Sequence, residues 1–203
     1  MFLEIKMKNF NDLVSEYSIE IPIIQRDYVQ GREYDEKADE ERKNFLESIF
    51  NALEDDSQFH LDFIYGSFDK NKFIPIDGQQ RLTTLFLLHW YFAKKEKINQ
   101  VIKFTYKTRV SSREFCDKIF LFDIDFADSL IKKQIIDSNL FIPYWENDPT
   151  IKSMLVVLDQ IHAISAKKNQ VKYEKLNLIT FEIFKLEDFG KEQSEELYRK
   201  MNS

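Results

Sequence analysis

The sequence predicts an α+β fold in which strands and helices alternate early in the chain and helices dominate later. Short runs rich in β-branched and aromatic residues, such as residues 61–68 and 72–76, are typical of strands. Apolar residues at helical spacing, as in residues 149–166, are typical of helices that bury one face. The chain has 203 residues, of which 43% are hydrophobic, so one substantial core is expected. We therefore predict one domain, with a core over residues 1–96 and a mainly helical extension over residues 97–203.

A strand and a helix are predicted before the first hairpin. Residues 18–28 are rich in β-branched and apolar residues around a proline, which lacks a backbone N–H, so an edge strand or an extended segment is expected. Residues 35–53 show helical spacing, and their stripe of Phe45, Ile49 and Leu53 is expected to pack on the core.

A hairpin and a buried helix are predicted next. The runs 61–68 and 72–76 are separated by Asp69-Lys70-Asn71, which is a plausible turn. A helix over residues 82–95 is apolar on nearly every face, and we therefore expect it to be buried.

The second half is predicted to contain mostly helices. Ser111 followed by Glu114 has the pattern of a capping box that opens a helix. Asp148 and Pro149 suit the N-cap and first position of another helix that reaches about residue 166. The remaining elements are a half-exposed strand over residues 101–107, a helix over 128–137, a strand over 176–186 and a final helix over 192–201.

The cysteine and histidine content excludes several kinds of site. Cys116 is the single cysteine, so the chain forms no internal disulfide and no multi-cysteine zinc site. This usage fits a reducing cytoplasm, which is the expected location. His60, His89 and His162 lack the spacing of metal ligands, and we expect His89 and His162 to be core residues with satisfied hydrogen bonds.

Hydropathy and charge limit the partners. The longest apolar stretch, residues 85–93, is roughly half of a membrane span, so no membrane partner is predicted. The formal net charge of -6 argues against a broad electrostatic footprint on DNA, although it is compatible with a local basic pocket.

The strongest candidate site is the polar run from Asp77 to Arg81, between a strand and a helix. The start of a helix presents unpaired N–H groups and favours an anion. Gly78 permits a positive φ, and Arg81 can donate two hydrogen bonds to a phosphate. Gln79 and Gln80 can orient a water or a base edge, and Asp77 can hold Mg²⁺ or polarise a water. The alternative is an ordinary capped loop with Asp77 as the N-cap.

A second candidate is the polar cluster Gln25-Arg26-Asp27-Tyr28. Arg26 can bind another phosphate oxygen pair, and Tyr28 offers a stacking surface. The alternative is the end of a surface strand with an Arg–Asp pair. Arg32 either joins the same pocket or lies in a solvated loop.

The order of these motifs resembles a known family. The sequence is similar to the D-G-Q-Q-R family of domains of unknown function, which form the N-terminal part of GmrSD-type modification-dependent restriction proteins and related phage-defence proteins. The segments that carry the resemblance are residues 21–28, 65–67, 76–85, 111–116, 148–151 and 197–203.

The resemblance implies a fold and a site. The family is similar to the ParB/sulfiredoxin-like superfamily, which implies a small mixed sheet with surrounding helices, followed by a mainly helical region. It also implies a nucleoside triphosphate, with GTP favoured, and Mg²⁺ as cofactors. The implied catalytic residues are Asp77, Gln79, Gln80 and Arg81, with Asp77 as the metal ligand. The implied nucleotide-binding residues are Gln25, Arg26, Gly78, Arg81 and Thr83.

The resemblance further implies partners. Restriction-type members couple nucleotide hydrolysis to DNA cleavage by a C-terminal H-N-H nuclease domain, so DNA is expected to bind through the full-length protein. A homo-oligomer is compatible with this arrangement. The family continues past residues 202–203 into an R-G-x-x-L stretch, so we expect this chain to be truncated at its C-terminal end. Two alternatives stay open: a sensing module for nucleotide or modified DNA without hydrolysis, and a ParB-like nuclease.

Overall fold

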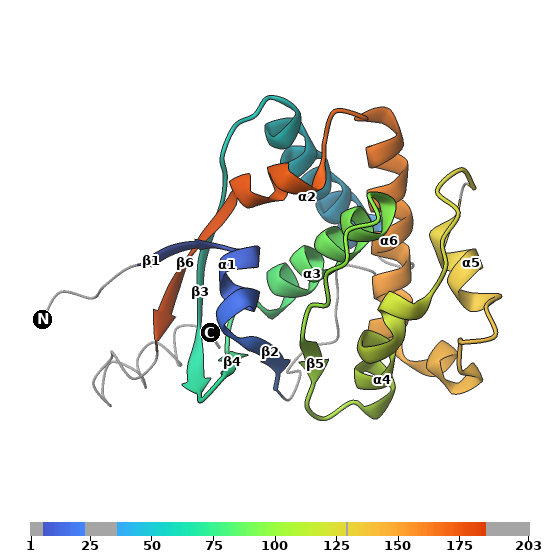
Figure 1. Ribbon diagram of the computed structural model, residues 1–203, viewed down its shortest axis with the longest axis horizontal. Coiled ribbons are helices and arrows are strands. Elements are labelled where there is room, and N and C mark those ends of the chain that lie inside the picture. Colours follow the sequence, from blue (N-terminus) through green and yellow to red (C-terminus); the bar gives the residue numbers. More distant parts are fainter. Residues whose placement is uncertain (1–5, 23–35, 129, 186–203) are drawn as a thin grey trace, which may run out of the picture.

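The computed structural model describes residues 6–22, 36–128 and 130–185, and it confirms the α+β class. A six-stranded sheet has the order β1-β6-β3-β4-β2-β5. Figure 1 shows the sheet on one side of the molecule and most of the helices on the other. The strands are β1 (Lys6–Asn9), β2 (Ser18–Ile21), β3 (Phe59–Asp69), β4 (Lys72–Pro75), β5 (Phe104–Tyr106) and β6 (Ile179–Lys185). The helices are α1 (Phe10–Glu16), α2 (Glu36–Glu54), α3 (Gln79–Lys95), α4 (Val110–Lys118), α5 (Ile131–Ile136) and α6 (Pro149–Lys167), with 3₁₀ turns Ile119–Leu121, Pro143–Asn147 and Tyr173–Leu178.

The sheet is mixed, and both halves of the chain contribute to it. β6 lies between β1 and β3, antiparallel to β1 and parallel to β3. β4 is antiparallel to β3, whereas β2 runs parallel to both β4 and β5. The second half of the chain therefore supplies an inner strand as well as helices.

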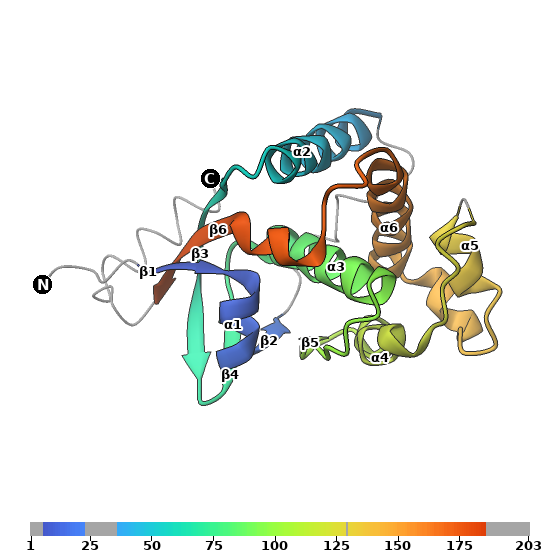
Figure 2. The ribbon, with the colours of Figure 1, turned by 45° about the horizontal axis from the view of Figure 1, so that its top comes forward.

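Helix α3 forms the centre of the core. Its residues from Leu82 to Ala93 are buried, as the apolar run predicted. Figure 2 shows α3 between the sheet and α6, with α2 above them. Trp90 donates from its indole nitrogen to the carbonyl of Ile119 at 2.9 Å, so this buried aromatic residue has its polar group satisfied. This bond joins α3 to the 3₁₀ turn Ile119–Leu121.

The predicted edge strand over residues 18–28 is wrong in position. The strand is Ser18–Ile21, and it lies between β4 and β5 rather than at an edge. The proline that suggested an edge, Pro22, follows the last residue of β2, so it removes no hydrogen bond within the strand. Residues 23–28 lie outside the described part of the chain.

The predicted capping box at Ser111 is also wrong. Helix α4 begins at Val110, with Arg109 at the N-cap position. The hydroxyls of Ser111 and Ser112 instead donate to the carboxylate of Asp148. Asp148 caps α6, as predicted, because its side chain accepts from the backbone N–H groups of Thr150 and Ile151. Asp148, which is distant in sequence, thus accepts hydrogen bonds from the hydroxyls of both Ser111 and Ser112.

Other boundaries differ by a few residues from those predicted. The hairpin turn at residues 69–71 and the helix α2 are confirmed. The strands β5 and β6 are shorter than predicted, and a 3₁₀ turn precedes β6. β1 and α1 were not predicted, although Asn9 and Asp12 form a capping box that marks the start of α1. The predicted final helix over residues 192–201 lies outside the described residues.

The two core histidines differ in how well they are satisfied. His162 lies 2.9 Å from the Tyr91 hydroxyl and 2.8 Å from the Asp128 carbonyl, through its two ring nitrogens. His89 has Nδ1 2.8 Å from the carbonyl of Leu85, but its buried Nε2 has no partner, so the prediction of full satisfaction is wrong for His89. None of the described helices is long and apolar enough to cross a membrane.

Candidate functional site

The polar run of Asp77 to Arg81 is mostly helix rather than loop. Helix α3 begins at Gln79, so the prediction that it starts at Leu82 is wrong. Gln and Arg are good helix formers, and they make up the first turn here. The connection from β4 to α3 therefore consists of only three residues, Ile76, Asp77 and Gly78. Three of the five predicted site residues are held on a regular helix.

Gly78 is required by both backbone conformation and space. It is the N-cap of α3 with φ 83°, which lies in the left-handed region. A Cβ atom at this position would lie 2.8 Å from a side-chain carbon of Ile64. Gly78 therefore has the positive φ that the sequence predicted. The alternative with Asp77 as the N-cap is wrong, because Gly78 occupies that position.

The turn is anchored to β3 by backbone hydrogen bonds. The N–H groups of Ile76 and Asp77 both donate to the carbonyl of Tyr65, at 2.8 and 3.1 Å. At the neighbouring position, any side chain on Gly66 would collide with the carbonyl of Ile74, so β3 and β4 approach closely here. The site is thus built on a rigid part of the sheet.

The side chains of Asp77 and Arg81 form an ion pair across the first turn of α3. The Arg81 Nη2 atom lies 2.8 Å from Asp77 Oδ2. The Arg81 side chain is 23% exposed and the Asp77 side chain is 43% exposed. Such exposed pairs at i,i+4 spacing stabilise a protein by only about 0.3–0.5 kcal/mol. The guanidinium can therefore engage an incoming anion at little cost in stability.

The start of α3 has the features of an anion site. The first backbone N–H groups of a helix have no acceptor within it, and Gly78 provides no side-chain cap. The helix dipole adds roughly half a positive charge at this end. Arg81 places a formal charge on the same turn. Backbone amides, dipole and guanidinium therefore all favour a negatively charged group.

Gln79 and Thr83 serve the structure of the turn. Gln79 donates from Nε2 to the carbonyl of Pro75 at 3.2 Å. The buried Thr83 hydroxyl donates to the Gln79 carbonyl at 2.9 Å and lies 3.0 Å from the Tyr106 hydroxyl. The carbonyl of Gln80 accepts a similar bond from the Thr84 hydroxyl at 3.1 Å. In this arrangement Thr83 joins α3 to β5 and is a positioning residue.

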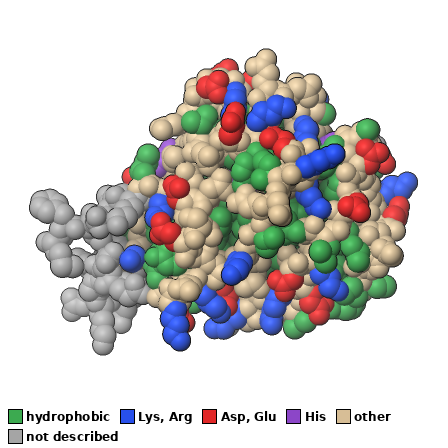
Figure 3. All heavy atoms as spheres, viewed as in Figure 1, with side chains coloured by type: hydrophobic (Ala, Val, Ile, Leu, Met, Phe, Trp, Pro, Cys, Tyr) green, Lys and Arg blue, Asp and Glu red, His purple; other side chains and the backbone are tan. Residues whose placement is uncertain are grey.

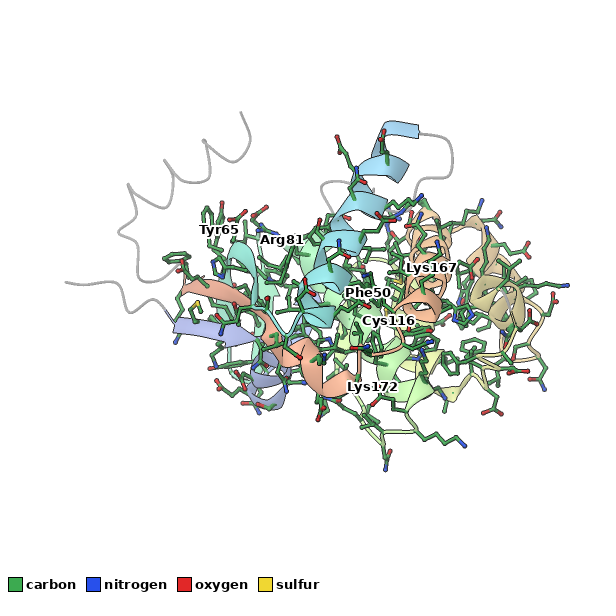
Figure 4. The ribbon with its side chains drawn as sticks, turned by 90° about the horizontal axis from the view of Figure 1, so that it is seen from above. Phe50, Tyr65, Arg81, Cys116, Lys167 and Lys172 are labelled. Atoms are coloured by element: carbon green, nitrogen blue, oxygen red, sulfur yellow. The ribbon has the colours of Figure 1, made fainter. Side chains whose placement is uncertain are left out.

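Tyr65 belongs to the candidate site. The sequence placed it in residues 65–67, a segment that carries the family resemblance, but assigned it no role. Burial is the largest cause that raises the pKa of its phenol; Asp77 raises it further and Arg81 lowers it. Figure 4 shows Tyr65 and Arg81 next to each other on one side of the molecule. The signal that could have found Tyr65 is its place in the strand directly before Gly66.

Gln25 and Arg26, together with Tyr28 and Arg32, lie outside the described residues. They follow β2, which runs parallel to β4. The carboxyl ends of parallel strands meet at one edge of a sheet, where ligands commonly bind.

Within the described part of the candidate site, Asp77 is the carboxylate that could hold Mg²⁺. The described residues contain no group of three or more His, Cys, Asp and Glu side chains suited to a metal. Mg²⁺ in nucleotide sites commonly binds one or two carboxylates, with phosphates and waters as the other ligands. A single Asp77 fits that mode and does not fit a metal cage made by protein alone.

Fold and site together define an α+β domain with a candidate anion site where a sheet strand enters a buried helix. Residues 10–203 match the family model for the N-terminal domain of the GmrSD restriction endonuclease, and the chain belongs to this family. This confirms the predicted resemblance to restriction proteins and indicates a role in phage defence. A search of curated proteins finds no significant match.

Proposed function

We propose that this domain binds a nucleoside triphosphate, with GTP favoured, and hydrolyses it. The observation that carries the proposal is the Asp77–Arg81 pair on the uncapped first turn of α3. Arg81 and the first-turn amides bind phosphate oxygens, because both donate hydrogen bonds to anions. Gly78 allows the phosphates to approach the backbone closely. In this proposal Gln25 and Arg26 contribute further contacts to the nucleotide.

Hydrolysis requires that a water be oriented and that negative charge be stabilised. In our proposal Asp77 binds Mg²⁺ or orients the attacking water, and Gln79 or Gln80 helps to position that water. Mg²⁺ would supply neutralisation of the phosphate charge, and Arg81 would stabilise charge that develops on the transferred group.

The domain acts within a larger restriction protein in this proposal. DNA cleavage is assigned to a C-terminal H-N-H nuclease domain, and this domain would control it through nucleotide binding. Figure 3 shows Lys and Arg side chains interspersed with Asp and Glu on the visible face. A mixed surface with a formal net charge of -6 supports DNA contact mainly through other parts of the full-length protein.

The same geometry favours a second candidate, a nucleotide sensor that does not hydrolyse. Asp77 is paired with Arg81, and the Gln79 amide is bound to Pro75, so two residues proposed for hydrolysis are already engaged. Binding would then change the state of the protein without turnover. Measurement of turnover separates the two candidates.

The test is phosphate release from GTP and ATP with Mg²⁺, measured alongside nucleotide affinity. Asp77→Ala is expected to abolish release, whereas Asp117→Ala removes an exposed carboxylate on α4 and is the matched control. Equal release by the wild type and Asp77→Ala would refute the role of Asp77. Binding without measurable release would leave the sensor as the function, and no binding would refute both.

A further inference from the structure

The strand before the candidate site contains a β-bulge. Between His60 and Phe63, β3 advances by three residues while its partner β6 advances by two. Asp62, in the bulge, has a positive φ of 21°. A bulge shifts the alternation of side chains by one position and is frequent beside active sites. As a result Leu61 and Ile64, three residues apart, both lie in the core.

The bulge leaves an aromatic side chain on the outside of the sheet. Phe63 is 46% exposed. Its ring stacks on Tyr65, with centroids 5.6 Å apart and planes inclined by 20°. Phe184 of β6 meets Phe63 edge to face at 5.8 Å. We call Phe63, Tyr65 and Phe184 the aromatic platform.

The aromatic platform is continuous with the candidate anion site. The carbonyl of Tyr65 accepts hydrogen bonds from the turn residues Ile76 and Asp77. The charges of Asp77 and Arg81 both influence the pKa of the Tyr65 phenol. The exposed ring of Phe63 is therefore connected through Tyr65, two residues further along β3, to the turn that contains Asp77.

We propose that Phe63 stacks against the base of a nucleotide whose phosphates bind at the first turn of α3. This inference rests on the proposed function and assigns the base-binding side of the same site. Aromatic rings stack on every base, and larger rings stack more strongly. The aromatic platform thus distinguishes a nucleotide from a bare polyphosphate and favours a purine over a pyrimidine.

Charge argues for this occupant over a second copy of the chain. The exposed ring of Phe63 stacks on Tyr65, and the charge of Arg81 acts on the Tyr65 phenol. The Arg81 cation suits the anionic part of a nucleotide. Met7 on β1, 54% exposed, and Phe63 on β3 are both in register with Glu182 of β6, so a charged residue separates these two exposed apolar side chains. A self-association surface would instead need a broad apolar area.

The test compares GTP with inorganic tripolyphosphate, using titration calorimetry on this chain. Phe63→Ala is expected to weaken GTP binding roughly 5- to 100-fold, which is the range for loss of one aromatic stacking partner. Affinity for tripolyphosphate should not change. Phe63→Trp should retain GTP affinity, and Leu121→Ala, which truncates another exposed apolar residue, is the control.

The outcomes separate this inference from the function on which it rests. Unchanged GTP affinity in Phe63→Ala would overturn the base contact and leave phosphate binding intact. An equal loss for GTP and tripolyphosphate would also overturn it, because the anion site itself would then be damaged. If the wild type bound neither ligand, both proposals would fail. A change confined to the sedimentation of the protein would assign Phe63 to self-association instead.

Discussion

The side chain of Arg81 lies one helical turn after Asp77, and the Arg81 Nη2 atom is 2.8 Å from Asp77 Oδ2. This ion pair lies at the turn that joins β4 to the buried helix α3. The pair holds a cation at the end of a helix that is already positive. That placement is unfavourable for helix stability, because cations are favoured at the opposite end. Asp77 offsets the penalty, so Arg81 is tolerated at the position where we propose that it binds phosphate.

Replacement of Arg81 should separate binding from stability. Arg81→Ala is expected to weaken nucleotide binding about 10- to 100-fold, because a charged hydrogen bond contributes about 1.5–3 kcal/mol. Arg81→Lys should recover only part of this, since lysine lacks the planar pair of donors. Urea unfolding should change by less than about 0.5 kcal/mol. Lys133→Ala on α5 is the control, and wild-type affinity in Arg81→Ala would contradict the role.

A side chain at Gly78 should destabilise the fold. Gly78→Ala is expected to cost roughly 2–4 kcal/mol, because the backbone is left-handed and the Cβ atom meets Ile64. The measurement is the free energy of unfolding in urea. Adding Ile64→Ala should cost less in the Gly78→Ala background than in the wild type, since it removes the collision. Additive costs would show that the contact with Ile64 is unimportant.

Loss of the buried carboxylate of Asp148 should loosen the contact between α4 and α6. Asp148→Ala removes the cap of α6 and the acceptor of two serine hydroxyls. We expect a loss of about 2–4 kcal/mol in unfolding free energy, from the cap and the unsatisfied hydroxyls. Asp117→Ala should stay within about 0.5 kcal/mol. A loss below 1 kcal/mol, roughly the value of an ordinary cap, would show that the serine contacts add nothing.

His89 should make the domain less stable in mild acid. Burial lowers the pKa of His89 to about 4, whereas an unfolded histidine has a pKa of about 6.5. The unfolded chain therefore binds a proton that the folded chain excludes. Stability is fully present above about pH 6.5 and falls as the pH drops towards 4, by up to about 3 kcal/mol.

The His89→Gln variant tests this pH dependence. Its unfolding free energy should vary less between pH 7 and pH 4 than that of the wild type, whatever its stability at pH 7. His60→Gln, which replaces an exposed histidine, is the matched control. An unchanged slope in His89→Gln would show that His89 does not carry the effect.

Local patterns predicted those parts of the fold that depend on neighbours in sequence. The hairpin at residues 69–71, the Asp148 cap and the glycine turn before α3 all have short-range signals. No short-range signal indicated the position of β6 in the sheet, because its pairing with β1 and β3 joins segments that are distant in sequence. Strict alternation would place Phe59, Leu61, Phe63 and Tyr65 on one face; the bulge breaks that pattern, so the aromatic platform could not be predicted.

The candidate site was predicted in its residue types and only partly in its shape. The chemistry of Asp77, Gly78 and Arg81 follows from the sequence, whereas the extension of α3 to Gln79 needed the geometry of Gly78. The hydrogen bond between Thr83 of α3 and Tyr106 of β5 could not be predicted, because the two residues are distant in sequence.

The inner position of β6 has a consequence for synthesis on the ribosome. Lys6 pairs with Ile183, so β1 lacks its partner strand until almost all of the described chain has been made. Sequence-distant contacts of this kind slow folding, because a long loop must close before they form. Until then the β3 edge that carries Tyr65 is unpaired along its length and prone to aggregation. Because the carbonyl of Tyr65 anchors the turn before α3, we expect this turn to reach its final packing only after β6 has been synthesised.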